Sequence, residues 1–333
     1  MHPSPLSISL LLSVLLSSTV VDSRDDCGNR CVGILYETWF DQLKFPLLPI
    51  YPTPNPTNTY RCWGEPAIGP YYSDNTTVAE IHADQMFRAG IDYIVADYSN
   101  SNILNSDLNG PLMVFLKLYE ARRLKMLPTP RVTFLIPADE KQLEILWNEY
   151  YEKLNAPDVF MSWEGKPLLL TLGKCTFDVC ENFTWRDTWA LRPQGGKWSF
   201  MDLYPQPFYV HDNVPEQMAV AAAQQETWMS ADTAHGRNYD YRSRKNDGRE
   251  GQNLADQFQR AIDTKVRTIL VKSWNEWCSI RTKDDLGPSV GGGYTDEFNS
   301  TYSNDIEPMK GGHGDKYLQM LTEHIKVFKS VKT

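Results

Sequence analysis

The repeated alternation of short apolar runs with amphipathic segments constrains the fold of this chain more than any other feature. Most of the apolar runs are continuous, as expected for strands of a parallel sheet that is covered on both faces. Seven strands are predicted, at residues 32–39, 91–98, 131–137, 167–172, 198–203, 218–223 and 268–274. Helical periodicity predicts helices at residues 77–89, 112–124, 140–154, 254–262 and 317–328.

This alternation predicts an α/β fold, with a closed (β/α)8 TIM-like barrel favoured over an open sheet. The best place for an eighth strand is residues 302–308. An open doubly wound sheet is the alternative, but no glycine-rich phosphate turn follows the first predicted strand. No linker divides the chain after its first residues, so residues 24–333 are expected to form a single barrel domain.

The first 23 residues predict a signal peptide, because an apolar run at residues 6–21 is followed at once by charged residues. An uncleaved anchor is the alternative. Three glycosylation sequons begin at Asn75, Asn182 and Asn299. The chain has six cysteines, and export would make disulfides their expected state, with fifteen possible complete pairings. We therefore expect a secreted, extracellular glycoprotein with no membrane segment after cleavage.

The formal net charge of −9 argues against nucleic-acid binding, which requires a basic face. One basic island stands out at residues 235–249, where arginines alternate with tyrosines. Arginine forks between aromatic rings would suit an anionic, sulfated polysaccharide. A solvated loop whose ion pairs are internal is the alternative. No residue pattern in the chain calls for a cofactor or a metal.

In a barrel, polar residues at the carboxyl ends of strands build the active site. The strongest such position is Glu276, which stands between Trp274 and Trp277 after an apolar run. Burial among aromatic rings would raise its pKa toward that of a general acid. Asp202, after the predicted strand at 198–203, supplies a second carboxylate for glycoside hydrolysis. Each also has a structural alternative: a capping or salt-bridged residue.

Two further strand ends carry polar or aromatic groups. Asp97 and Asn100 could bind sugar hydroxyls, and Tyr36 and Trp39 could contact a sugar ring. Glu37 is a third carboxylate at the end of the first strand.

The last third of the chain resembles glycan-cleaving β/α barrels of glycoside hydrolase families 99 and 71, and is most similar to the endo-fucanases of family 168. The motifs that carry this resemblance are residues 198–202, 236–238, 274–277 and 303–308. The resemblance implies an endo-acting, retaining hydrolase of sulfated α-fucan, with Asp202 as nucleophile and Glu276 as acid/base. The predicted substrate-binding residues are Tyr36, Trp39, Asp97, Asn100, Tyr204, His235, Arg237, Asn238, Tyr239, Trp274, Asn275 and Trp277.

A mannose-directed glycosidase similar to family 99 is the first alternative. The sequence departs from that family's pair of nearby glutamates, because Trp277, Cys278 and Ser279 follow Glu276. The second alternative is a lectin-like barrel that binds glycan without cutting it. A secreted structural protein, whose aromatic residues all lie in the core, is the third.

Overall fold

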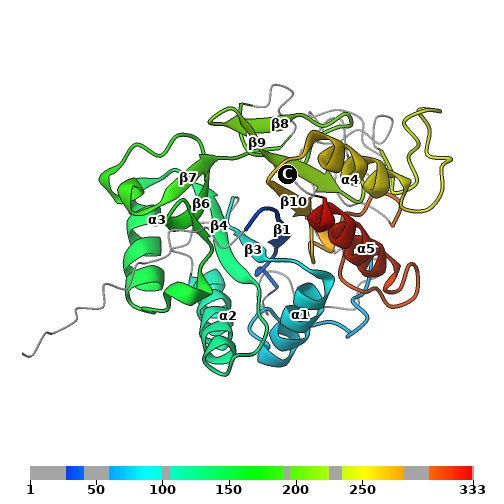
Figure 1. Ribbon diagram of the computed structural model, residues 1–333. Helices are drawn as coiled ribbons and strands as arrows, with labels where there is room; N and C mark the ends of the chain where they lie inside the picture. The colour runs from blue at the N-terminus through cyan, green and yellow to red at the C-terminus, as the bar shows by residue number, and fades with distance from the viewer. Residues whose placement is uncertain are drawn as a thin grey trace, which may run out of the picture.

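The computed structural model of the chain describes residues 28–40, 60–99, 106–190, 196–224, 235–280 and 300–331 (Figure 1). Parallel strands run through its centre in the order β7-β6-β4-β3-β1-β10-β9. Their bounds are β1 Cys31–Tyr36, β3 Tyr93–Asp97, β4 Arg131–Pro137, β6 Lys166–Leu172, β7 Thr184–Asp187, β9 Val214–Ala221 and β10 Thr268–Lys272.

Two shorter strands pair antiparallel with strands of this sheet. They are β5 (Ser162–Trp163), which pairs with β6, and β8 (Phe208–His211), which pairs with β9. A separate two-stranded ribbon joins β2 (Tyr60–Cys62) to β11 (Cys278–Ile280). The disulfide Cys62–Cys278 links these two strands.

Side-chain hydrogen bonds span the gap between β7 and β9. Thr188 and Trp198 form a parallel bridge beyond the end of β7. Gln217 of β9 then accepts a hydrogen bond from the Ser199 nitrogen (2.9 Å) and donates one to the Ser199 oxygen (2.6 Å). The residues after Trp198 therefore lie between β7 and β9. The side chain of Gln217 thus forms the two hydrogen bonds to Ser199 that a neighbouring strand would form through its main chain.

Helices cover the outer face of the curved sheet (Figure 1). They are α1 (Thr76–Ala89), α2 (Ser106–Leu124), α3 (Glu140–Ile145), α4 (Gln252–Thr264) and α5 (Lys316–Ser330). A π-helical turn, Leu146–Glu152, continues α3, and 3-10 turns lie at Pro157–Val159 and Asp178–Asn182. None of the helices in the described ranges combines the length and the apolar character that a membrane span requires.

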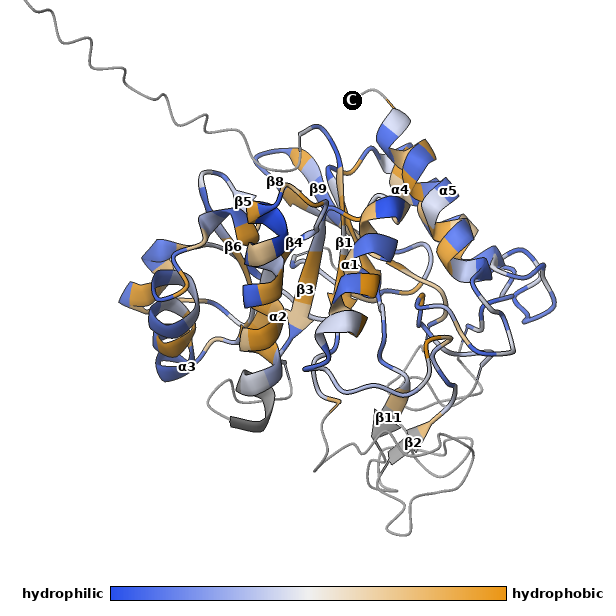
Figure 2. Ribbon diagram, turned by 90° about the horizontal axis from the view of Figure 1, so that it is seen from below, coloured by the Kyte–Doolittle hydropathy of each residue, from blue (hydrophilic) through white to orange (hydrophobic). Residues whose placement is uncertain are grey.

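The core is divided into two layers by the alternation of side chains along each strand. In β1, Val32 and Ile34 pack outward against the helices, whereas Leu35 belongs to a separate inner cluster. Tyr93 of β3 and Trp198 lie in the same inner cluster. Figure 2 shows the apolar strands at the centre, with helices of mixed polarity around them. An apolar layer inside the curved sheet and another outside it is the packing of an α/β barrel-like fold.

The fold corrects two strand predictions. Residues 302–308 do not form a strand, and they pass instead as a loop beneath the turn that follows β10. The strand β7 was not predicted, because its residues Thr184–Asp187 include two charged side chains. The predicted strand at 198–203 is reduced to the single bridge at Trp198. The disulfide expectation is confirmed for Cys62–Cys278 and Cys175–Cys180, and Cys31 is also disulfide-bonded.

Candidate active site

Three charged residues reach the mouth of the barrel because they continue the inward-facing positions of their strands. Leu35 faces inward, so Glu37, two positions later, is expected to face the same way. Val95 leads in the same manner to Asp97, and Leu270 leads to Lys272. The strand register pairs Tyr36 with Ala96, so Glu37 and Asp97 end adjacent strands side by side.

Glu276 joins these charges from the turn after β10. Its Oε2 lies 3.2 Å from the Nζ atom of Lys272, and the two side chains are only 12% and 4% exposed. The Lys272 ammonium also lies 5.7 Å from the centre of the Phe200 ring. A cation at this distance and degree of burial stabilises the ionised form of the Glu276 carboxylate.

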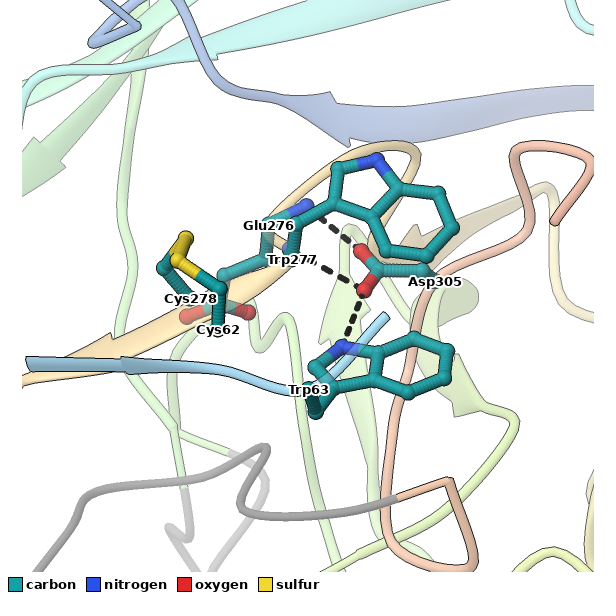
Figure 3. The surroundings of a disulfide bond; sticks show 6 residues. All are labelled: Cys62, Trp63, Glu276, Trp277, Cys278 and Asp305. Atoms are coloured by element: carbon teal, nitrogen blue, oxygen red, sulfur yellow. Dashed lines mark hydrogen bonds between the residues drawn. A yellow bond between two sulfur atoms is a disulfide. The ribbon is translucent and has the colours of Figure 1, made fainter. Parts of the chain in front are cut away.

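Asp305 holds the turn that presents Glu276 (Figure 3). Its carboxylate accepts hydrogen bonds from the main-chain nitrogens of Glu276 and Trp277, and from Trp63 Nε1 at 2.8 Å. Trp277 has a left-handed backbone conformation, with φ of 47°. The Cys62–Cys278 disulfide follows directly. The position of Glu276 is thus fixed from both sides, by a buried carboxylate and by a covalent cross-link.

Glu37 is the most deeply placed carboxylic acid at the end of β1 and is only 3% exposed. Its side chain is buried, and no described residue forms a hydrogen bond with its Oε2. Burial raises the pKa of Glu37 well above its usual range, and the nearby carboxylates Asp97 and Glu276 raise it further, against the opposing effect of Lys272. The arrangement therefore combines a buried carboxyl group, whose protonated form is favoured, with a carboxylate paired to lysine.

A fully bonded network lies beneath these residues. His82 Nε2 lies 2.9 Å from Glu307 Oε1, and His82 Nδ1 lies 3.0 Å from the Tyr36 hydroxyl. Glu307 Oε2 accepts hydrogen bonds from the Tyr71 hydroxyl (2.8 Å) and from Trp277 Nε1 (2.6 Å). All five side chains are buried, so the network serves as a rigid floor for the site.

Four of the predicted substrate-binding residues lie in or against this network. Tyr36, Trp274, Asn275 and Trp277 were expected to contact substrate, but all four are buried. Trp274 packs in the outer core, edge-on to His82. Asn275 holds the main chain of Glu37. These aromatic and amide groups support the carboxylates from below.

Arg237 is also buried and makes internal hydrogen bonds. Its Nε donates to the Ser303 oxygen (2.8 Å), and its Nη2 donates to the Asp305 oxygen (2.7 Å). The guanidinium lies 3.8 Å from the centre of the Tyr317 ring. Arg237 thus anchors the loop that carries Asp305. Asn238 is also bonded internally, because its amide donates to the Asn246 oxygen.

Half-buried aromatic rings gather beside Asp202. His235 stacks on Tyr239 with ring centres 3.7 Å apart, and Tyr204 packs on Tyr241 at 4.1 Å. Burial lowers the pKa of His235 to about 4, so the ring is neutral at physiological pH. The Tyr241 hydroxyl donates to Gln224, whose amide in turn donates to the Asp202 carbonyl.

The remaining predicted residues occupy varied settings. Asp202 is buried, and its carbonyl also accepts from Gln257, which fixes its main chain. Trp39 is half-buried, and Asp97 accepts a hydrogen bond from the Ser99 nitrogen. Asn75 is exposed and Asn182 is half-buried. Asn100 and Asn299 lie outside the described residues.

Sequence reasoning missed Lys272, Asp305, Glu307 and His82. Lys272 could have been found as the next inward position after Leu270 in an otherwise apolar strand. Asp305 and Glu307 were assigned to a predicted strand. Their spacing of two residues could have indicated that both carboxylates face the same side of the chain. His82 stands alone among apolar helix positions and offered no signal of its own.

A second acidic cluster lies at the opposite ends of the strands, where Glu164, His211 and Glu216 approach one another within 4.8 Å. Arg186 already donates to Glu164 (2.8 Å) and to both oxygens of Glu216 (2.7 and 2.9 Å). A cation would have to displace this guanidinium, so the cluster is better described as a buried ion-pair network.

No protein-family model matches this sequence, and none of the curated proteins compared with it is similar. Solved structures do match its fold. The GH99 endo-α-mannosidase from Bacteroides thetaiotaomicron matches with a TM-score of 0.58 and 13% identity, over 93% of this chain and 99% of that one. The same enzyme in complex with Bis-Tris propane matches with a TM-score of 0.51 and 13% identity, over 90% and 97%. At this identity the likeness shows an α/β barrel-like fold alone.

Proposed function

We propose that this protein is an endo-acting glycosidase that cleaves internal bonds of a mannose-containing glycan. The observation that carries the proposal is the buried Glu37 carboxyl group, whose pKa is raised, beside the lysine-paired Glu276 at the barrel mouth. Glycoside hydrolysis requires such a division between an acid and an ionised carboxylate.

In the proposed reaction Glu37 donates its proton to the glycosidic oxygen as the bond to the anomeric carbon breaks. The Glu276 carboxylate attacks that carbon and forms a covalent glycosyl intermediate. Glu37, now ionised, takes a proton from water, which displaces Glu276 and restores both groups. Lys272 keeps Glu276 ionised before the attack and donates to it again after its release.

A second assignment keeps Asp202 as nucleophile and Glu276 as acid/base, as the family resemblance implies. The aromatic rings beside Asp202 favour a sugar-binding role for that side of the mouth. The buried Lys272 beside Glu276 favours an ionised role for Glu276 instead. Replacement of each acid in turn separates the two assignments.

The choice of mannose follows the similar solved structures, which are endo-α-mannosidases. The expectation of sulfated fucan came from the resemblance to family 168, with the basic island as its support. Arg237, the first arginine of that island, is buried and bonded to the 303–305 loop, whereas Arg242, Arg244 and Arg249 are exposed. We further propose that the protein is secreted, because its disulfides are compatible with an oxidising compartment and its first residues resemble a signal peptide.

The test is incubation of the purified protein with α-mannan, high-mannose oligosaccharides and sulfated fucan, followed by measurement of chain length and new reducing ends. We expect cleavage of the mannose-containing substrates, and a loss of at least about 100-fold in Glu37→Gln and Glu276→Gln. Glu149→Gln, on the exposed surface, is the matched control.

Two outcomes would reject parts of the proposal. If Glu37→Gln keeps its activity and Asp202→Asn loses it, Asp202 and Glu276 are the catalytic pair and Glu37 is not the acid. Glycan binding with no reducing ends from any substrate would identify a lectin-like barrel.

A further inference from the structure

The basic island at residues 235–249 takes no part in the reaction proposed above. It contains five cationic and two acidic residues, in a chain whose net charge is −9. Arg237 is buried. The other four cations are exposed and together form the cationic surface of the loop: Arg242, Arg244, Lys245 and Arg249. No acid within the described ranges forms an ion pair with any of these four.

The two acids of the island accept hydrogen bonds from the loop itself. Asp240 Oδ1 accepts from the Arg242 nitrogen at 2.9 Å, and Asp247 Oδ1 accepts from the Ser243 hydroxyl at 2.7 Å. Both donors are neutral groups, so neither carboxylate neutralises an arginine side chain by direct contact. Internal ion pairs, which were the alternative for this segment, are therefore absent from the described part of the loop.

The loop holds its cations on an ordered turn, which lies beside α4 at the edge of the molecule (Figure 1). Asp240 and Lys245 form an antiparallel bridge, and the Arg244 nitrogen donates to the Asp240 oxygen at 2.7 Å. Arg242, Arg244 and Lys245 therefore lie within one turn, at residues 240–245. Because this main chain is already ordered, binding of a partner costs less conformational entropy.

The overall acidity of the chain does not prevent an anionic partner from approaching this turn. Exposed charges more than about 8 Å apart are largely screened at physiological ionic strength. The local potential is therefore set mainly by the loop's own cations. One exposed arginine binds a single anion weakly. A polymer with repeated anions contacts several cations at once and releases its condensed counterions.

Aromatic rings beside the cationic surface favour a carbohydrate over other polyanions. Tyr239 and Tyr241 are half-buried, and both pack against His235. Such rings contact the apolar faces of sugars, and planar guanidinium groups bind two oxygens of one anionic group. Nucleic-acid binding requires a more extended basic face than this acidic molecule provides.

We infer that the cationic surface binds a sulfated polysaccharide and holds the protein on it. The inference goes beyond the proposed hydrolysis, because this binding requires none of the carboxylates at the barrel mouth. None of the four cations belongs to the group around Glu37 and Glu276. The sulfated chain and the glycan to be cleaved are thus bound by different side chains.

The test compares fluorescently labelled dextran sulfate with labelled dextran, which has the same sugar backbone without the anions. Binding to the full chain is measured by fluorescence anisotropy at low and at physiological salt. We expect saturable binding of dextran sulfate that weakens as salt rises, and no binding of dextran. The variant Arg242→Gln/Arg244→Gln/Lys245→Gln should bind at least about tenfold more weakly and depend less on salt.

The matched control is Lys117→Gln/Lys141→Gln/Lys326→Gln. It removes the same charge from three exposed lysines on α2, α3 and α5, and it should leave binding unchanged.

A second loop variant, Arg242→Gln/Lys245→Gln, spares Arg244, whose backbone is left-handed with φ of 57°. It should show a smaller loss of binding, and it separates the loss of charge from any change in the turn.

Three outcomes overturn the inference: the loop variants bind dextran sulfate as tightly as the lysine control, dextran binds equally well, or a DNA duplex binds more tightly than dextran sulfate. Dextran sulfate contains no mannose, so the two proposals fail separately. Cleavage of mannan without binding of dextran sulfate would refute this inference alone. Binding of dextran sulfate without any cleavage would refute only the proposed function.

Discussion

Asn275 clamps the main chain of Glu37 with two hydrogen bonds. The Glu37 nitrogen donates to Asn275 Oδ1 at 2.8 Å, and Asn275 Nδ2 donates to the Glu37 oxygen at 3.1 Å. The same amide nitrogen also donates to the Tyr71 hydroxyl. Asn275 is the residue immediately before Glu276, so one fully buried side chain couples the two acids of the proposed site.

Asn275→Ala should therefore lower both stability and activity. The substitution leaves the main-chain groups of Glu37 buried without partners, which should reduce the free energy of unfolding by about 2 kcal/mol. The activity of the molecules that remain folded should also fall, because the main chain of Glu37 is no longer held in place. Urea denaturation and reducing-end assays measure the two effects. Gln259→Ala, an exposed amide on α4, should change neither.

The raised pKa of Glu37 should make stability decline as pH rises. Between the ordinary pKa of a glutamate and the raised value, the folded protein holds a proton that the unfolded chain has released. The free energy of unfolding therefore falls across this interval. Glu37→Gln should flatten that decline, whereas Glu149→Gln should not. Denaturation at a series of pH values above about 4.5 gives the comparison. An unchanged slope in Glu37→Gln would show that Glu37 ionises normally.

Lys272→Met should be the most damaging single change at the mouth. It removes the cation beside Glu276 while keeping much of the apolar side chain, so buried negative charges face each other uncompensated. We expect a loss of about 3–5 kcal/mol, measurable by thermal or chemical denaturation. Lys153→Met removes an exposed ion pair with Glu149 and should cost less than about 0.5 kcal/mol. Equal effects of the two substitutions would contradict the buried pairing.

The two described disulfides should differ in their contribution to stability. Cys62–Cys278 closes a loop of 216 residues two positions after Glu276, whereas Cys175–Cys180 spans only five. Replacing the first pair by alanines should lower the free energy of unfolding by about 2–5 kcal/mol, and replacing the second should cost less. Activity should also fall only for the first pair. The reverse order would exclude a role for Cys62–Cys278 in holding the Glu276 turn.

Asn75 should have two separable roles. Its Oδ1 caps α1 by accepting hydrogen bonds from the nitrogens of Thr77 and Val78, which leaves the amide nitrogen to carry a glycan. Thr77→Ala should abolish glycosylation at this sequon and keep the cap. Asn75→Ala should abolish both and cost about 1 kcal/mol. Mass spectrometry of protein expressed in a eukaryotic host, with thermal melts, tests both. If the mass of Thr77→Ala differs from that of the original protein only by the exchange of threonine for alanine, Asn75 carries no glycan.

The alternation of apolar runs and amphipathic segments by itself determined the α/β class and most of the strands. A strand that is buried on both faces consists almost entirely of apolar residues, so it can be recognised from its own sequence. It also located Glu276, which follows an apolar run within the chain. The irregular part of the sheet was less accessible. Strand β7 contains charged residues, so it does not form an apolar run. The segment after Trp198 is held by the side chain of Gln217, a contact between distant residues that the local sequence does not predict.

Only the tertiary structure decided which residues surround Glu276 and what each does. Lys272 and Glu37 meet there because the parallel strands β10 and β1 end at one edge, and the loop that carries Asp305 passes beneath them. The pKa of Glu37 depends on that assembly of charges. The tertiary structure also places Arg237, Trp277 and Tyr36, which were predicted to contact substrate, in buried positions. Local sequence specifies which side chains are present. Their burial and partners are set by residues up to more than two hundred positions away, such as Glu37 and Asn275, which are 238 positions apart.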